Sequence, residues 1–453
     1  MSARRPIARP IVRPIIRFVL AVAFAGFASF GLAAPAQALK PVKVTSPGGI
    51  TAWLVEDHTN PIVTLNFAVG AGTSIDPAGK EGVVQMMVAM LDEGAGDLPS
   101  EAFQVRLKQL SARLSFDASA DRITGGLTAL SANRDASFDL LALALRAPRF
   151  DTAPLERTRE QMLSELRRAQ TEPWSIAQRL WWSAAFPAHP YGRRAAGTPD
   201  SVKSLTAADL QAQHRIAFSR DTLVVGVVGD ITADQLKILL DRVFGALPAT
   251  ADRPKVATVA PVATGQIAVA RRESSQSVVI FGHAGIARDD KDFYPAFVMN
   301  HLLGGGSFSS RLYMEIREKR GLAYSVSTSV STLDHSNLLY GSVATKNERV
   351  KESIDLIRAE WRRMAEHGVT QSELDGAKAF LVRSYALRFS SSSAIASILV
   401  GVQLDKMDID FFEKRNGYVE AVTVEDIKRV AARLLKADKL TFTVVGNPQG
   451  VDG

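Results

Sequence analysis

The sequence predicts an α+β fold made of two similar units in tandem. Residues 204–230 ("SLTAADLQAQHRIAFSRDTLVVGVVGD") and 421–447 ("AVTVEDIKRVAARLLKADKLTFTVVGN") align without a gap. Residues 65–96 parallel residues 279–310, because each run begins as an alternating strand and continues through a polar turn into an apolar helix that ends in glycines. Strands and helices do not alternate regularly, so mainly antiparallel sheets with helices packed on one face are expected.

The individual elements follow from caps and periodicity. Thr206 and Thr423 are expected helix N-caps, because each is followed by an aspartate in the first helical turn. The apolar runs "LVVGVVG" and "LTFTVVG" that come after these helices predict the closing strand of each unit. Long amphipathic helices are expected over residues 135–146, 154–170 and 348–366.

The boundary between the units is indicated by composition. The stretch "GALPATADRPKVATVAPVATG", residues 245–265, is rich in alanine, proline and threonine, which is typical of a linker. The predicted organisation is an N-terminal unit over residues 39–247, a linker over residues 248–265 and a C-terminal unit over residues 266–453.

Charge and cysteine content exclude some classes of function. The net charge is +7, but five arginines precede the first acidic residue, Glu56, and the rest of the chain is nearly balanced. No basic stripe with interleaved aromatic residues is present, which argues against a nucleic-acid-binding protein. The chain has no cysteine, so disulfides, thiolate metal sites and thiol nucleophiles are excluded.

The first 38 residues resemble a secretory signal peptide. A basic run precedes the apolar stretch "FVLAVAFAGFASFGLAA", and Ala36 and Ala38 give the small-x-small pattern of a signal-peptidase site. A membrane anchor is the alternative, but the apolar run is shorter than the roughly 20 residues that a spanning helix needs. We expect cleavage after Ala38 and export to the periplasm.

The run "GKEGVVQMMVAMLDEGAG", residues 79–96, predicts a buried helix, because apolar residues occupy every face of it. Gln85 is the single polar residue in the middle of the helix. A polar turn precedes the helix, and glycines flank it on either side.

This strand, turn and helix resemble the opening of zinc peptidases of the insulinase or pitrilysin type, peptidase family M16. In active members the helix carries His-x-x-Glu-His, in which the two histidines bind zinc and the glutamate acts on the metal-bound water. In this chain the motif positions are Gln85, Val88 and Ala89, and the later glutamate ligand corresponds to Glu165. The resemblance therefore implies that this chain has no zinc, that Gln85 hydrogen-bonds instead and that apolar side chains fill the catalytic position. The seven histidines do not pair at useful spacings elsewhere, and His189 is expected to be structural.

The run "GGGSFSSRLYMEIREKRGLAYSVSTS", residues 304–329, resembles the C-terminal unit of the same family. The resemblance implies that Arg317 holds peptide substrate and that the hydroxyl of Tyr324 donates to the substrate carbonyl as it becomes an oxyanion. It also suggests that Gly304, Gly305 and Gly306 bind substrate backbone. An ordinary amphipathic helix with a solvated charged face, ending at Gly321, is the alternative.

The resemblance implies the zinc-free subunit of an exported heterodimeric metallopeptidase. The partner would be an M16-type subunit that carries the His-x-x-Glu-His motif and the zinc, and the substrates would be oligopeptides. This chain would be inactive alone and would supply Arg317 and Tyr324 in trans. Two alternatives stay open: a structural subunit without catalytic input, and a separate peptide-binding protein or homodimer.

Overall fold

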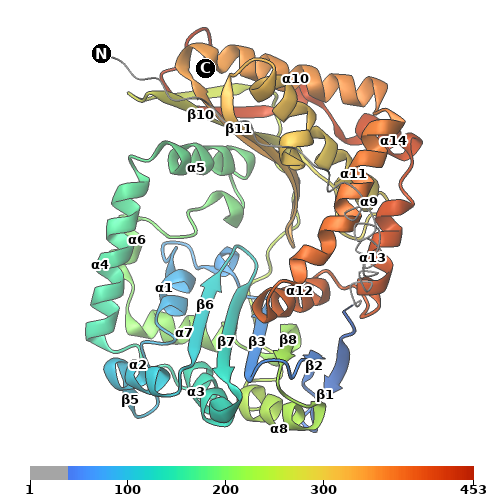
Figure 1. The fold of residues 1–453 in the computed structure, drawn as a ribbon. Helices are drawn as coiled ribbons and strands as arrows, with labels where there is room; N and C mark the ends of the chain where they lie inside the picture. Colours follow the sequence, from blue (N-terminus) through green and yellow to red (C-terminus); the bar gives the residue numbers. More distant parts are fainter. Residues whose placement is uncertain (1–38, 453) are drawn as a thin grey trace, which may run out of the picture. The chain divides into compact units, whose positions relative to one another are not determined.

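The computed structural model describes residues 39–452, so the predicted signal peptide lies outside the described residues. The N-terminal unit contains a six-stranded sheet in the order β1-β2-β8-β3-β7-β6 (Figure 1). Its strands are β1 (Val42–Thr45), β2 (Thr51–Glu56), β3 (Ile62–Val69), β6 (Arg113–Ala118), β7 (Ile123–Leu130) and β8 (Val224–Gly229). A short two-stranded sheet, β4 (Gly94–Ala95) with β5 (Leu98–Pro99), lies outside it.

The C-terminal unit repeats this topology. Its sheet has the order β11-β12-β10-β13-β9, formed by β9 (Ile267–Arg271), β10 (Gln276–Ala284), β11 (Ala323–Thr332), β12 (Asn337–Lys346) and β13 (Thr441–Gly446). Read from β9, this order matches β2-β8-β3-β7-β6 strand for strand. In both sheets the first pair, β2 with β8 and β9 with β13, is parallel and the other pairs are antiparallel. The predicted α+β fold with two repeated units is confirmed.

The helices lie close to their predicted positions. Thr206 and Thr423 each form a capping box with the aspartate three residues later. The helices of the N-terminal unit are α1 (Val83–Ala89), α2 (Ser100–Gln109), α3 (Arg134–Arg146), α4 (Thr152–Ala169), α5 (Pro173–Ala185), α6 (Pro199–Ser204), α7 (Ala207–Ala217) and α8 (Ala233–Phe244). Those of the C-terminal unit are α9 (Phe293–Asn300), α10 (Val350–His367), α11 (Gln371–Arg383), α12 (Ser392–Leu404), α13 (Phe411–Glu420) and α14 (Val424–Leu434).

Each sheet receives one helix from the other unit on its second face. Alternate residues of β8 point to opposite faces, and Val227 lies in the core of its own unit whereas Val228 packs in a cluster with residues of α12. Correspondingly, Val279 of β10 lies in the core of the C-terminal unit and Val278 packs in a cluster with α5. The expectation that helices cover one face of each sheet is therefore incomplete, because α5 and α12 are exchanged between the units.

The linker is fixed to both units although residues 251–266 form no helix or strand. The backbone N–H groups of Val259 and Val262 donate to the carbonyl oxygens of His335 (2.9 Å) and Ala185 (2.8 Å). His189 contributes from the N-terminal unit, with its Nε2 atom 2.8 Å from the carbonyl oxygen of a linker residue. The structural role expected for His189 is thus explained by this contact.

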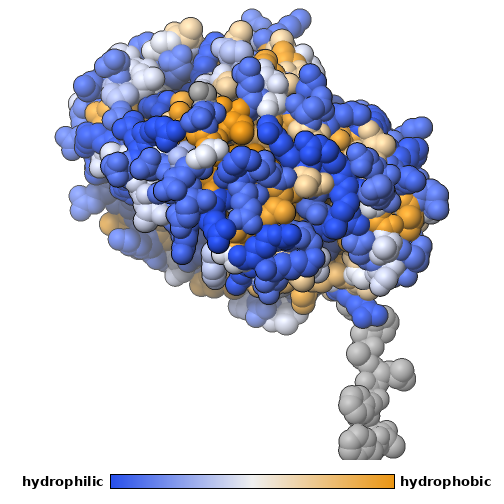
Figure 2. Space-filling model, turned by 90° about the horizontal axis from the view of Figure 1, so that it is seen from above, coloured by the Kyte–Doolittle hydropathy of each residue, from blue (hydrophilic) through white to orange (hydrophobic). Residues whose placement is uncertain are grey.

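Apolar residues are largely buried in the cores of the described residues. The face of the molecule in Figure 2 is predominantly hydrophilic, and hydrophobic residues reach the surface there in limited areas. Within residues 39–452 no single helix has the length and apolar character of a membrane span. One pair of helical segments, Gln371–Phe389 and Ser392–Leu404, meets that criterion only when the two are taken together, and they are bent by 117°.

Candidate functional site

Helix α1 begins at a glycine turn that its surroundings require. Gly82 has a φ of +94°, and a Cβ atom there would lie 2.9 Å from the carbonyl oxygen of Ala196. The carboxylate of Asp76 accepts hydrogen bonds from the N–H groups of Gly82 (2.7 Å) and Val84 (3.2 Å). A left-handed residue with a close backbone neighbour favours glycine, and the carboxylate satisfies N–H groups that a helix leaves free at its start. The polar turn therefore fixes where α1 begins.

Asp76 is itself buried, with 5% of its surface exposed. Burial raises the pKa of its carboxyl to about 7, although the two backbone N–H donors act in the opposite direction. The charge at the start of α1 therefore changes near neutral pH.

The positions that correspond to the zinc ligands of the family lie around one cavity. Gln85, Ala89 and Glu165 line a space of about 180 Å³ between α1 and α4. The Nε2 atom of Gln85 donates to the carbonyl oxygen of Ala118 (2.8 Å), which is the kind of hydrogen bond expected of this amide. The prediction that apolar side chains fill the catalytic position is wrong. Ala89 is exposed, and its methyl group is too small to fill the space. Of the three motif positions, Val88 alone lies in the core, where it is 3% exposed.

The side chains around this cavity do not fit a zinc ion. Glu165 is exposed and accepts a hydrogen bond from Gln161 (3.2 Å). Glu93 also lines the cavity, but it is paired with Arg157 at 2.6 Å. Catalytic zinc sites use three protein ligands chosen from histidine, cysteine and carboxylates. None of the described residues that line this cavity carries an imidazole, so the donor set is incomplete.

Arg317 and Tyr324 contact each other in the C-terminal unit. The guanidinium carbon of Arg317 lies 4.8 Å from the centroid of the Tyr324 ring and 4.8 Å from that of the Tyr313 ring. Arg317 also donates a hydrogen bond to the hydroxyl of Tyr313. Tyr324 stands at the start of β11 and is 82% exposed. The pair thus consists of an exposed phenol beside a guanidinium that Tyr313 holds in place.

The segment that carries Arg317 is a π-helix over Tyr313–Glu318, not an ordinary α-helix. The turn after it contains Gly321, which has a φ of +60° and donates its N–H to the carbonyl oxygen of Arg317 (2.8 Å). Glycine at this position matches the predicted end of the helix. Short π-helical insertions occur frequently at functional sites.

The alternative of a solvated charged face is wrong for two residues of this run. Glu315 is 8% exposed and forms ion pairs with Lys319 (2.5 Å) and Arg320 (2.6 Å). Arg311 donates to both carboxylate oxygens of Glu373, at 2.8 and 2.9 Å, and holds the pKa of that carboxyl down at about 2. These charges fix the run against neighbouring elements.

The glycine run before this segment is closely packed. A Cβ atom would lie 2.6 Å from Thr328 Oγ1 if added at Gly304, and 2.6 Å from Asn300 Nδ2 if added at Gly305. At Gly306 it would lie 2.6 Å from a backbone carbonyl oxygen. Packing alone therefore favours glycine at all three positions. Contact of these glycines with substrate remains a prediction.

A cluster of Asp121, Asp334 and His335, which sequence spacing did not reveal, joins the two units. Their ligand atoms lie within 4.8 Å of one another. All carboxylate oxygens already accept hydrogen bonds, however. Asp121 accepts from the hydroxyl of Tyr191 (2.6 Å) and the N–H of Asp334 (3.1 Å), while Asp334 accepts from both terminal nitrogens of Arg122. We assign this cluster to interactions between the units and not to a metal.

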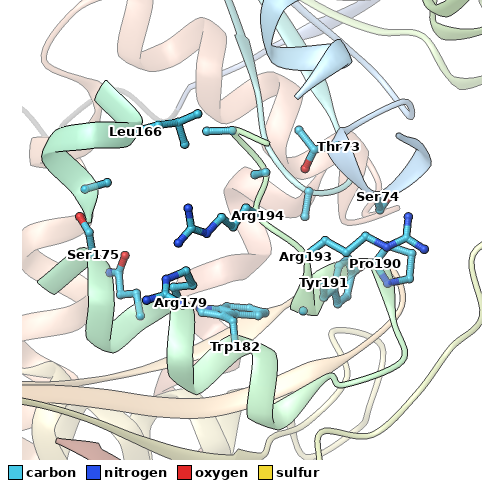
Figure 3. Close-up of a pocket in the computed structure, with 16 residues that line it drawn as sticks. Thr73, Ser74, Leu166, Ser175, Arg179, Trp182, Pro190, Tyr191, Arg193 and Arg194 are labelled. Atoms are coloured by element: carbon cyan, nitrogen blue, oxygen red, sulfur yellow. The ribbon is translucent and has the colours of Figure 1, made fainter. Parts of the chain in front are cut away.

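A second cavity, of about 400 Å³, lies beside the first and shares Ala196 with it. Its lining includes Arg179, Arg194 and Trp182 (Figure 3). Spacing in the sequence does not single out these arginines, although the loop over residues 189–199, "HPYGRRAAGTP", contains two adjacent arginines. The doubled arginine in that loop was the available signal, but Arg179 comes from α5 and could be placed beside it only by the fold.

The comparisons with known proteins agree with the fold. The family model "Insulinase (Peptidase family M16)" matches residues 51–199, and the model "Peptidase M16 inactive domain" matches residues 204–381. A "non-peptidase homolog YmxG" of Helicobacter pylori is 27% identical over 395 residues, which cover 86% of this chain and 90% of that protein. An "uncharacterized zinc protease" of Mycobacterium tuberculosis is 27% identical over 411 residues, 88% of this chain and 92% of that protein.

A solved structure is also similar. The crystal structure of a peptidase M16 inactive domain from Pseudomonas fluorescens has a TM-score of 0.85 and 27% identity, and the match covers 92% of this chain and 99% of that chain. The model called "inactive domain" covers the C-terminal unit and not the motif helix, and the term "non-peptidase" describes the Helicobacter protein. The repeated topology and the two family models together show that the chain belongs to peptidase family M16.

Proposed function

We propose that this chain is the zinc-free subunit of an exported, heterodimeric M16-type metallopeptidase. It binds oligopeptides and supplies Arg317 and Tyr324 to the zinc site of a partner subunit that carries the His-x-x-Glu-His motif. Under this proposal the first 38 residues, which resemble a signal peptide, direct export, and the complex acts in the periplasm. The chain alone has no peptidase activity under this proposal, because its motif positions carry no imidazole and no general base.

The arrangement of Arg317 and Tyr324 carries the proposal. A phenol that is 82% exposed gains little stability from packing, yet Arg317 lies against its ring and is itself held by Tyr313. A donor held in place before the reaction can stabilise an oxyanion without reorganising. The phenol would donate to the substrate carbonyl oxygen, and the guanidinium would restrain both the phenol and the peptide.

The test is a peptidase assay on the purified chain mixed with M16-type subunits that carry the zinc motif, with and without a chelator. We expect activity only in the mixture and its loss on chelation. Tyr324→Phe should lower turnover by the complex about a hundredfold, which is typical of removing one oxyanion donor, while assembly is retained. Tyr418→Phe, at another partly exposed tyrosine, is the matched control and should leave turnover unchanged.

Other outcomes identify the alternatives. Stable assembly without a gain in activity over the zinc subunit alone would indicate a structural subunit, and normal turnover in the Tyr324→Phe complex would remove the role given to that hydroxyl. A chain that dimerises with itself and binds peptide without a partner would be a separate peptide-binding protein.

A further inference from the structure

Two cationic side chains in the second cavity lack partners within the described chain. Arg179 lies on α5 and Arg194 follows the short turn at Pro190–Gly192, and both line the cavity. Among the hydrogen bonds and ion pairs of residues 39–452, neither guanidinium has a carboxylate or carbonyl acceptor. Both residues are only partly exposed. A guanidinium that is partly withdrawn from water and has no acceptor is costly, so such a pair indicates that an external anion completes the site.

The charged residues that line the cavity all have one sign. Among the described residues of the lining, three are arginines and none is acidic. Burial, with a smaller contribution from the charge of Arg179, lowers the pKa of Arg194, which agrees with two cations facing each other without a counterion. Arg193 differs, because it is exposed and its Nη1 atom donates to the backbone carbonyl of Asp76 (3.3 Å). Figure 3 shows the side chain of Arg193 directed away from Arg194, while Arg194 extends into the cavity toward α5.

The remaining lining is mainly apolar. Leu166 of α4 and the indole of Trp182 lie on opposite sides of Arg194 in Figure 3, and alanines and a proline form much of the rest. Gln178 adds an amide that can bond to a peptide group. A cavity of about 400 Å³ with an apolar wall and a few convergent polar groups has the usual character of a binding site for a small group. The occupant should therefore combine an anion with an apolar body.

The cavity also lies beside the position of the family's zinc site. Leu166 directly follows Glu165 on α4, and Ala196 lines both cavities. A peptide that passes Gln85 and Glu165 would reach the second cavity within a short length of chain. The anion that a peptide carries at its end, next to an apolar side chain, is the α-carboxylate of its last residue.

We propose that this cavity binds the C-terminal residue of a peptide, with Arg179 and Arg194 holding the carboxylate and the side chain packed between Trp182 and Leu166. This inference rests on the proposed function in so far as it requires a peptide ligand, and it names the peptide end that the chain recognises. Guanidinium groups hold carboxylates through two parallel hydrogen bonds, which lysine cannot reproduce. The preferred ligands are oligopeptides with a free C-terminus and an apolar last residue.

The test measures binding to the purified chain without a partner subunit. A fluorescein-labelled nonapeptide that ends in phenylalanine is titrated by fluorescence anisotropy, once as the free acid and once as the C-terminal amide. We expect the acid to bind at least tenfold more tightly than the amide, as befits charge-assisted hydrogen bonds in a partly dehydrated cavity. Arg194→Gln and Arg179→Gln should each weaken binding of the acid about tenfold or more and abolish the difference between the two peptides.

The controls separate binding from folding. Arg193→Gln removes the lining arginine whose guanidinium donates to the backbone carbonyl of Asp76 and points away from Arg194, so it should preserve the difference between acid and amide. Arg194→Lys keeps the charge without the fork and should restore only part of the affinity. Because Arg179 and Arg194 have no acceptors in the described chain, their glutamine variants should melt at or above the temperature of the unmodified chain. If the glutamine variants lose melting temperature in parallel with their loss of peptide binding, the two arginines stabilise the fold and the proposed site is refuted.

Three further results would also overturn the inference. Equal affinity for acid and amide would exclude a carboxylate site, while the binding itself would still support a peptide-binding function. Competition by N-acetylphenylalanine as strong as that by the peptide would assign the cavity to a free carboxylic acid. Absence of peptide binding, with normal turnover by Tyr324→Phe complexes, would refute this inference and the proposed function together.

Discussion

Removing the indole of Trp181 should loosen the contact between the two units. Trp181 lies on α5 of the N-terminal unit, is 1% exposed and packs on the sheet of the C-terminal unit. Its Nε1 atom donates to the carbonyl oxygen of Thr441 in β13 (3.2 Å), and a Cβ atom at Gly282 in β10 would lie 2.9 Å from its ring. Replacing a buried tryptophan by alanine costs about 3–5 kcal/mol, from lost apolar burial and the cavity left behind. We expect Trp181→Ala to lower the free energy of unfolding by about that amount.

Urea unfolding followed by circular dichroism measures the total effect, and hydrogen exchange locates it. The amides of β10 and β13 should exchange faster in Trp181→Ala, because α5 no longer covers that face of the sheet. Trp174→Ala, at a partly buried tryptophan that packs against the same cluster, is the matched control and should cost less than half as much. If exchange in β10 and β13 is unchanged while stability falls, α5 does not hold the units together and our account of the exchanged helices is wrong.

Three other predictions concern single contacts. Gly226→Ala should destabilise the chain by about 1–3 kcal/mol in urea, because the new Cβ atom would lie 2.7 Å from the carbonyl oxygen of Ala396 on α12. Glu373→Gln should cost about 1 kcal/mol at pH 7, a value kept small because the carboxylate is partly exposed. Its difference from the unmodified chain should vanish as the pH falls from about 4.5 through 2, where the carboxylate becomes protonated. Asp76 has a raised pKa, so its carboxyl binds more protons in the folded state, and stability should fall as the pH rises from about 4 to 7. Asp76→Asn should flatten that slope in urea titrations at several pH values, by up to about 4 kcal/mol over the range.

The sequence repeat was sufficient to predict two units, because each unit carries its own strand and cap signals. It did not predict that α5 and α12 pack on the opposite sheets. Periodicity identifies the apolar face of a helix but not the sheet that covers it, and Val227 and Val228 are both apolar because β8 is buried on both faces. For the same reason, the cavity arginines could not be recognised, since Arg179 and Arg194 meet only through the tertiary fold.

Within the motif helix, the sequence correctly indicated burial but not the open cavity. Apolar residue types on every face predict a filled site, and Val88 does lie in the core. Ala89, however, is too small to fill the volume beside Gln85, and Glu165 is held at its far side by α4. The cavity is open because the side chain at position 89 is small, and a hydropathy pattern does not report side-chain volume.

This open cavity allows a direct test of whether it is the equivalent of the family's zinc site. In the double variant Gln85→His with Ala89→His, two imidazoles four residues apart on one helical face would join Glu165, which lines the same cavity. Two histidines and one glutamate form a known catalytic zinc set. In isothermal titration calorimetry we expect the double variant to bind Zn²⁺ and the unmodified chain to bind none at this site. Adding Glu165→Gln to the double variant should weaken zinc binding about tenfold or more.

Zinc binding in the double variant should not restore peptide hydrolysis, because position 88 still lacks the general base. Adding Val88→Glu to the double variant should not restore peptide hydrolysis. Val88 is 3% exposed, so a carboxylate at this position would be buried in apolar surroundings without a partner. The triple variant should therefore unfold at a lower urea concentration than the double variant. If the triple variant hydrolyses peptide and is as stable as the double variant, then α1 can rotate so that the side chain at position 88 faces the cavity. If the double variant does not bind zinc, then Gln85, Ala89 and Glu165 line one space but do not have the geometry of a metal site. In that case the backbone positions needed for zinc binding, and not only the ligand side chains, differ from those of the active family members.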